Sequence, residues 1–207
     1  MKVPGNWKSL LRNSQNKEEL FQYLSDVAVQ SPFNPDKGIY ATSGASVLSS
    51  DPHADMSMLS PCNHEEADTR VILHVLDAAR KGASKVLIRT VDTDVVVLAI
   101  AHFFSLLLDE LWVAIGTGTS LRYIAIHKIA SGLGKKKSEA LAFFHSFTGC
   151  DTTTYFTGKG KLSAWKTWQV LSVVTLSLHT LSIKPDSITE ELHKLKCFVV
   201  VLYDRTT

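Results

Sequence analysis

Apolar residues recur along the chain at two spacings, every three or four residues as in helices and in short alternating stretches as in strands. In the first thirty residues they recur every three or four positions, which predicts two short amphipathic helices. Residues 31–61 are instead rich in Ser, Pro, Gly and Asp, and Pro32 and Pro35 end the helical pattern. Two short apolar alternations, at 39–42 and 47–48, interrupt this stretch. It therefore predicts a loop with at most a hairpin.

The middle of the chain switches between helical and strand-like patterns. Apolar residues at helical spacing after Asn63, with Gly82 after the last of them, predict a helix, and short apolar runs predict strands. The expected helices are 63–81 and 95–108, and the expected strands are 85–91, 111–115 and 123–126. Helices that alternate with strands build a parallel sheet covered by helices. The fold class is therefore predicted to be α/β.

Helical patterns return in the last third of the chain. Ser138 is expected to begin a helix that runs through Phe147, and a Gly turn followed by another helix is expected over 157–168. An apolar run over 188–202 follows. Three consecutive lysines just before Ser138 are expected to lie in a solvated loop. They are Lys135, Lys136 and Lys137.

Composition is that of an ordinary globular protein and restricts the chemistry. The chain has 207 residues, 45% of them hydrophobic, with 22 Lys and Arg against 20 Asp and Glu. The net charge of +2 excludes a strongly basic coat, so any nucleic-acid binding must come from a local patch. Three cysteines without a C-x-x-C pair fit neither a disulfide framework nor a zinc site, which predicts an intracellular location, nuclear or cytoplasmic. The apolar run 95–108 is shorter than the roughly 20 residues of a membrane span, so no membrane partner is expected.

Histidines form no recognisable metal-ligand pattern in the sequence. The spacings of five of them match no known zinc motif and no cysteine pairs with them, so surface or half-buried positions are expected. These five are His64, His74, His102, His127 and His145.

Acidic residues gather at three places where the expected elements meet. They are Glu66 and Asp68 at the start of helix 63–81, Asp92 and Asp94 at the end of strand 85–91, and Asp151 at the end of a helix. Each place has a structural explanation, since Asn63 with Glu66 has the form of a capping box, Asp94 can cap the next helix, and Asp151 suits a turn. Two carboxylates about 5 Å apart repel by roughly 3 kcal/mol at an effective dielectric constant near 20, so several together need a cation.

The cation that such a cluster predicts is Mg²⁺ or Mn²⁺, because oxygen-only ligand sets suit these ions. Two such ions about 4 Å apart activate a water and stabilise the leaving oxygen in phosphodiester cleavage. Residues two apart on a regular helix point in nearly opposite directions, so Glu66 and Asp68 share a site only where the helix is not yet regular. The expected metal-binding and catalytic residues are Glu66, Asp68, Asp92, Asp94 and Asp151.

The three acidic segments, in this order, resemble the motifs of a nuclease family. Glu66-Ala67-Asp68, Asp92-Thr93-Asp94 and Gly149-Cys150-Asp151 are similar to the E-A-E/D, D-x-D and G-C-D motifs of the flap endonuclease-like 5′ nucleases, a branch of the PIN-like fold. That family places a helix-turn-helix module with a G-x-G turn just after the last Asp, and residues 157–161 are similar to it. Backbone N–H groups of a Gly turn bind phosphate, and lysines add salt-sensitive attraction. The residues expected to contact nucleic acid are Gly158, Lys159, Gly160 and Lys161.

The resemblance implies a PIN-like, Rossmann-like parallel sheet flanked by helices, and metal-dependent cleavage of nucleic acid, DNA rather than RNA. It covers residues 63–168, the expected PIN-like nuclease core. An N-terminal helical arm over 1–30 and a Ser/Pro-rich loop over 31–62 would precede this core, and a C-terminal helical segment over 169–207 would follow it. The chain also resembles a group of uncharacterised PIN-like proteins that occur in many copies in animal genomes.

Two departures from the family pattern bear on activity. The first strand of the family supplies another metal-binding Asp, whereas no apolar strand followed by Asp precedes Ser31 here. Lys159 stands where the turn of the family usually has an apolar residue. The chain is therefore expected to be a fragment or a divergent copy, and whether it cleaves anything stays open at this point.

Two other functions also stay open. Residues 91–96 resemble the D-x-D-x-V motif of the haloacid dehalogenase-like phosphatases, which implies Asp92 as nucleophile and Asp94 as acid, although that motif normally lies on the first strand of its family. A non-catalytic PIN-like remnant would instead hold nucleic acid or a protein through the three lysines and the Gly158 turn.

Overall fold

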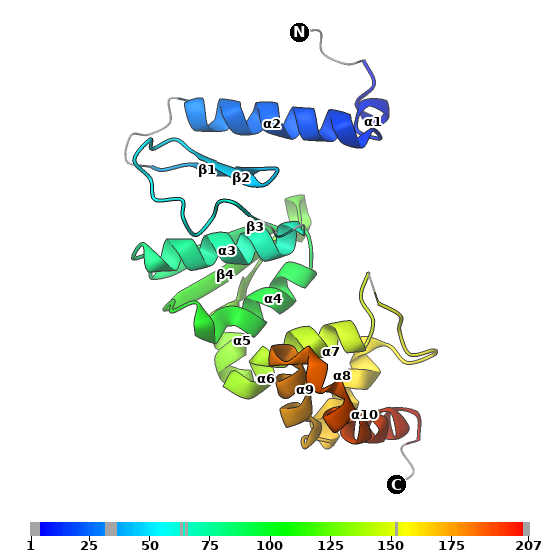
Figure 1. The fold of residues 1–207 in the computed structure, drawn as a ribbon. Helices are drawn as coiled ribbons and strands as arrows, with labels where there is room; N and C mark the ends of the chain where they lie inside the picture. Colours follow the sequence, from blue (N-terminus) through cyan, green and yellow to red (C-terminus); the bar gives the residue numbers. More distant parts are fainter. Residues whose placement is uncertain (1–4, 32–36, 63, 65, 152, 205–207) are drawn as a thin grey trace. The chain divides into compact units, whose positions relative to one another are not determined.

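The protein divides into two compact units, 1–77 and 78–207, each of which is described by itself. The computed structural model describes residues 5–31, 37–62, 64, 66–151 and 153–204 (Figure 1). Pro32, Pro35 and Asn63, which the sequence analysis used as boundaries, lie outside the described residues. Among the described residues, no helix combines the length and apolar character needed to cross a membrane.

The first unit contains the two expected N-terminal helices and the expected hairpin. The helices are α1 (Trp7–Leu10) and α2 (Ser14–Gln30), and the antiparallel strands are β1 (Tyr40–Ser43) and β2 (Ser46–Ser49). The Asn6 and Asn13 side chains accept hydrogen bonds from backbone N–H groups in the first turns of α1 and α2, which explains where these helices begin. The hairpin is joined to α2 by a hydrogen bond from the Ser43 hydroxyl to the Gln22 amide oxygen.

Helix α3 (Ala67–Arg80) confirms the helix expected after Asn63, and its first part is tied to the hairpin of the first unit. Thr42 Oγ1 lies 2.7 Å from His74 Nε2, and Arg70 Nη1 donates to the carbonyl of Gly44 at 2.8 Å. Gly82 follows the helix with a φ of +97°, a conformation that suits the residue after a helix end.

A mixed three-stranded sheet forms one side of the second unit. Its order is β3 (Lys85–Thr90), β4 (Glu110–Ile115) and β5 (Arg122–Ala125). Strands β3 and β4 are parallel, with Thr90 opposite Ile115, and are joined through α4 (Asp94–His102) and the 3₁₀ helix η1 (Phe103–Ser105). The prediction of an α/β fold is confirmed at this level.

The prediction that the whole sheet is parallel is wrong for β5, which runs antiparallel to β4. Only residues 116–121 separate the two strands, and they include the short 3₁₀ helix η2 (Gly118–Ser120). A parallel connection needs a crossover of about a dozen residues or more, so this connection can only turn back. Gly116, with a φ of +93°, makes the turn.

Two helical predictions also need correction. Residues 126–133 form α5 (Ile126–Leu133), which was not expected, and the expected helix 95–108 is shorter because α4 ends at His102. The three lysines do not lie in a loop, because they begin α6 (Lys135–Glu139). The Lys137 ammonium lies 4.8 Å and 5.0 Å from the ring centroids of Trp165 and Trp168, so packing on aromatic faces orders this segment.

Four helices build the C-terminal core of the second unit (Figure 1). They are α7 (Leu141–Phe147), α8 (Lys161–Val170), α9 (Val174–Ile183) and α10 (Ile188–Tyr203), with the 3₁₀ helix η3 (Pro185–Ser187) before α10. Phe144 of α7 packs on Trp168 of α8, with ring centroids 4.5 Å apart, and both side chains are buried with Phe198 of α10. The apolar run at 188–202 is therefore the core-facing helix of this bundle.

Gly149, at the end of α7, provides a stability test of this architecture. Its φ is +101°, and a Cβ atom there would lie 2.6 Å from Cβ and 2.9 Å from Cα of Tyr155. Gly82 has nearly the same φ but nothing within 4 Å of its Cβ position, so Gly82→Ala isolates the backbone strain. We expect Gly82→Ala to lower the free energy of unfolding in urea by about 1 kcal/mol and Gly149→Ala by about 3 kcal/mol. Equal losses for the two variants would show that the contact with Tyr155 is not a close one.

Candidate metal and nucleic-acid site

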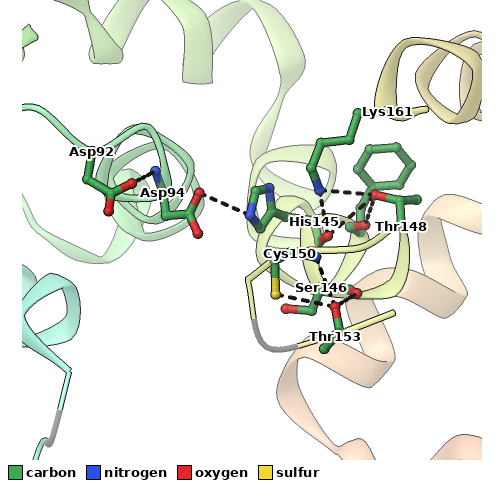
Figure 2. Close-up of polar contacts among 9 residues, drawn as sticks. Asp92, Asp94, His145, Ser146, Thr148, Cys150, Thr153 and Lys161 are labelled. Carbon is green, nitrogen blue, oxygen red and sulfur yellow. Dashed lines mark hydrogen bonds and ion pairs between the residues drawn. The ribbon is translucent and has the colours of Figure 1, made fainter. Parts of the chain in front are cut away.

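The Asp92 and Asp94 pair lies directly after β3, at the carboxyl end of the parallel strands, as expected. Asp92 N–H donates to Thr90 Oγ1 at 3.0 Å, and Asp94 N–H donates to Asp92 Oδ1 at 2.9 Å (Figure 2). The side chain that holds the first turn of α4 is thus that of Asp92, whereas the capping explanation assigned this role to Asp94. Asp92 is exposed and Asp94 is half-buried, so solvent reaches the pair.

His145, on α7, joins this pair to the helix that precedes the third acidic motif. Its Nε2 lies 3.2 Å from Asp94 Oδ1, and its side chain is only 16% exposed. No described residue gives this nitrogen a well-aligned hydrogen bond. His145 is half-buried, as expected, but the sequence analysis did not predict its contact with Asp94. The available signal was its position one helical turn before Gly149, the start of the G-C-D motif.

The turn after α7 is held by side-chain hydroxyls. Thr148 Oγ1 donates to the carbonyl of Phe144 at 2.7 Å, which closes the helix. Thr153 Oγ1 donates to the carbonyl of Ser146 at 2.7 Å and accepts a hydrogen bond from Cys150 N–H at 3.0 Å. Asp151 is exposed in this turn. The prediction that Gly149 ends the helix is confirmed by its positive φ.

Lys161, the first residue of α8, contacts the end of α7 (Figure 2). Its Nζ donates to the carbonyl of His145 at 2.8 Å and lies 3.5 Å from Thr148 Oγ1. A cation at the carboxyl end of a helix is favoured by the helix dipole. Burial lowers the pKa of the Lys161 ammonium, while the negative charges of Cys150 and Asp94 oppose this shift. Lys161 was expected to contact phosphate, and the structure gives its ammonium partners within the chain.

The G-x-G turn itself lines a pocket with the end of α7. The pocket has a volume of about 350 Å³, and its walls include Thr148, Gly149, Tyr155, Phe156 and residues 158–161. Gly160 is the N-cap residue of α8 and, having no side chain, provides no side-chain cap for the N–H groups of that first turn. Lys159 Nζ lies 5.5 Å from the ring centroid of Tyr203, whose hydroxyl donates to the carbonyl of Thr157 at 2.9 Å. The four residues expected to contact nucleic acid therefore line one concave surface.

Glu66 and Asp68 belong to the first unit. Glu66 is exposed and lies just before the first residue of α3, and Asp68 is half-buried in the first turn. The Glu66 carbonyl accepts hydrogen bonds from Thr69 Oγ1 at 2.9 Å and from Arg70 N–H at 3.3 Å. Glu66 thus precedes the regular helix, which is the condition under which the two carboxylates can share a ligand.

The carboxylate oxygens of Asp92 and Asp94 at the end of β3 are of the type that Mg²⁺ and Mn²⁺ prefer. Mg²⁺ is usually held by one or two carboxylates together with waters and substrate phosphates, and Asp92 and Asp94 provide such a solvent-accessible pair. Over the described ranges of the chain, no three His, Cys, Asp or Glu side chains gather into a group that could hold a metal ion. The five-carboxylate site expected from the sequence therefore stays a prediction, with its second-unit part built around Asp92 and Asp94.

Comparisons with known proteins identified no relative of this chain. No protein-family model, no curated protein and no solved structure matches the chain. What carries the functional argument is therefore the arrangement of the residues described above.

The partly buried Lys161 ammonium predicts a pH dependence of stability. Because burial lowers its pKa in the folded protein below the ordinary lysine value of 10.5, the unfolded chain binds more protons between these two pKa values. The contribution of Lys161 to the free energy of unfolding should therefore rise as the pH increases through this window. Lys161→Met lacks the titration, so the free energy of unfolding of the parent minus that of the variant should grow as the pH rises toward the ordinary lysine pKa of 10.5. A difference that falls over this range would contradict the burial of the ammonium.

Proposed function

We propose that this chain is a PIN-like, metal-dependent nuclease in which Asp92 and Asp94 hold Mg²⁺ or Mn²⁺ and the turn 158–161 contacts the nucleic-acid backbone. The observation that carries the proposal is the 3.2 Å contact between Asp94 and His145. It joins the D-x-D segment at the end of β3 to the helix that leads into the G-C-D segment, although the two are far apart along the chain. The resemblance to the nuclease motifs adds Glu66, Asp68 and Asp151 to the proposed ligand set.

The chemistry divides between the metal and the residues that would hold it. A bound divalent ion supplies a water of lowered pKa and neutralises the charge that develops on the leaving oxygen. Asp92 and Asp94 would hold this ion, and the hydrogen bond from the backbone N–H of Asp94 to Asp92 Oδ1 fixes the Asp92 carboxylate against the start of α4. The parallel pairing of β3 and β4 places this pair at the sheet edge where ligand sites of α/β folds lie.

Backbone binding by the turn 158–161 follows from the start of α8. The uncapped N–H groups of this helix and the positive end of its dipole favour a phosphate group in the pocket. Since Lys161 and Lys159 already have partners within the chain, we assign them a secondary role, as charges that attract the backbone without a fixed contact.

Loss of the two carboxylates at the end of β3 tests the nuclease. In the Asp92→Asn, Asp94→Asn double variant we expect Mn²⁺-dependent cleavage of a labelled DNA flap substrate to fall at least about 100-fold, because the ion loses both charged ligands. The fold should persist, since an Asn side chain at 92 keeps the oxygen that accepts the Asp94 N–H bond. Asp109→Asn removes another exposed carboxylate, before β4, and should cleave like the parent. A double variant that cuts as fast as the parent would remove these residues from the site.

Nucleic-acid binding without cleavage is the second candidate, and the pocket at the turn 158–161 favours it because it needs no metal. In this case a gel shift with the same DNA should weaken steeply with salt and persist in EDTA, while no product forms in Mn²⁺. Gly158→Asp, which adds a negative charge at the pocket wall, should abolish the shift. A shift that this variant leaves intact would place nucleic acid elsewhere on the chain.

A further inference from the structure

We propose that His145 is the positioning residue of this site, which holds the Asp94 carboxylate through its imidazole and Lys161 through its main-chain carbonyl. The inference rests on the proposed function and deepens it, because it assigns the proposed metal-binding pair its supporting residue. His145 matches none of the motifs through which the chain resembles the nuclease family, and it was found only from its contacts.

The imidazole is directed at Asp94 and away from solvent. Its side chain is 16% exposed, and Nε2 itself is inaccessible to water. Among the described residues, the Asp94 carboxylate is the group recorded within ion-pair distance of this nitrogen. The 3.2 Å approach of Nε2 to Oδ1 is a close polar contact and not an aligned hydrogen bond.

The helix that carries His145 is firmly packed, as a positioning residue requires. Its neighbour Phe144 packs on Trp168 with ring centroids 4.5 Å apart, and Phe147 packs on Phe156 and Phe198 with centroids 5.3 Å and 5.8 Å apart. Helix α7 also packs against α4, the helix that begins with Asp94. Because both ends of the contact belong to packed helices, the imidazole restricts the carboxylate more than a surface side chain would.

The main-chain carbonyl of His145 contacts Lys161, which belongs to the pocket at the turn 158–161. The His145 carbonyl accepts a hydrogen bond from Lys161 Nζ at 2.8 Å, and Lys161 lines the pocket beside the G-x-G turn. In both acidic residues at the end of β3 the Oδ1 atom is held by a protein group, by Asp94 N–H for Asp92 and by His145 for Asp94. One residue thus couples the orientation of the proposed metal ligand to the start of α8 (Figure 2).

Manganese binding to the full chain tests the role, with the bound fraction measured by electron paramagnetic resonance of free Mn²⁺. We expect His145→Ala to weaken binding at least about tenfold, as loss of a group that supports a metal ligand commonly does. In His145→Gln the side-chain amide can reach the same oxygen, so affinity should return to within about threefold of the parent. The control is His179→Ala, which removes a similar half-buried contact, 2.9 Å from Glu139, outside the site and should bind like the parent.

Three results would overturn the inference: parental Mn²⁺ affinity in His145→Ala, no recovery in His145→Gln, or an equal loss in His179→Ala. A parent chain that binds no Mn²⁺ would instead contradict the proposed function. The contact is then judged by imidazole ¹⁵N spectra alone. Asp94→Asn should shift the His145 Nε2 resonance and Asp109→Asn should leave it unchanged, whereas an unmoved resonance in Asp94→Asn would end the proposal.

Discussion

The packing of Phe144 against Trp168 is the interaction on which the rest of the candidate site depends. Both rings are buried, and they fix α7 against α8 in the middle of the four-helix core. His145, Thr148 and Gly149 follow Phe144 within little more than one turn, so their positions are set by the same contact. Truncation of a buried aromatic side chain typically costs about 3–5 kcal/mol, far more than the polar contacts of this site contribute. The positions of the polar residues of the site therefore depend on the packing of the apolar core.

A second constraint, the length of the connections, explains which parts of the fold the sequence could predict. Strands β3 and β4 were expected to be parallel because a helical pattern separates them, and they are. The connection between β4 and β5, residues 116–121, is too short for a crossover, so β5 must run antiparallel to β4. The length of this connection could have been counted from the sequence. By contrast, residues 135–139 were expected to form a loop and instead form α6, where Lys137 lies over the rings of Trp165 and Trp168. These two tryptophans are remote from Lys137 in the sequence. Local composition could not reveal a contact of that kind.

The same distinction separates the predicted part of the site from the part that was missed. Asp92 and Asp94 could be found because a strand pattern ends just before them, and the G-x-G turn because glycines punctuate the sequence. His145 and the partners of Lys161 could not, because their roles arise from contacts between elements that fold far apart along the chain. The position of His145 one helical turn before Gly149 was visible in the sequence, but that position does not identify Asp94 as its neighbour in space.

The contacts of Asp92 and Asp94 also change the reason for expecting a cation. The sequence predicts a cation because neighbouring carboxylates repel one another, yet part of this repulsion is offset by other groups of the chain. A backbone N–H group holds Asp92, His145 holds Asp94, and the Lys161 ammonium attracts the Asp94 charge. Charge balance alone therefore does not demand a metal ion at the end of β3. The proposed cation depends instead on accessibility, since Asp92 and Asp94 present solvent-accessible carboxylate oxygens of the kind that a hard cation prefers.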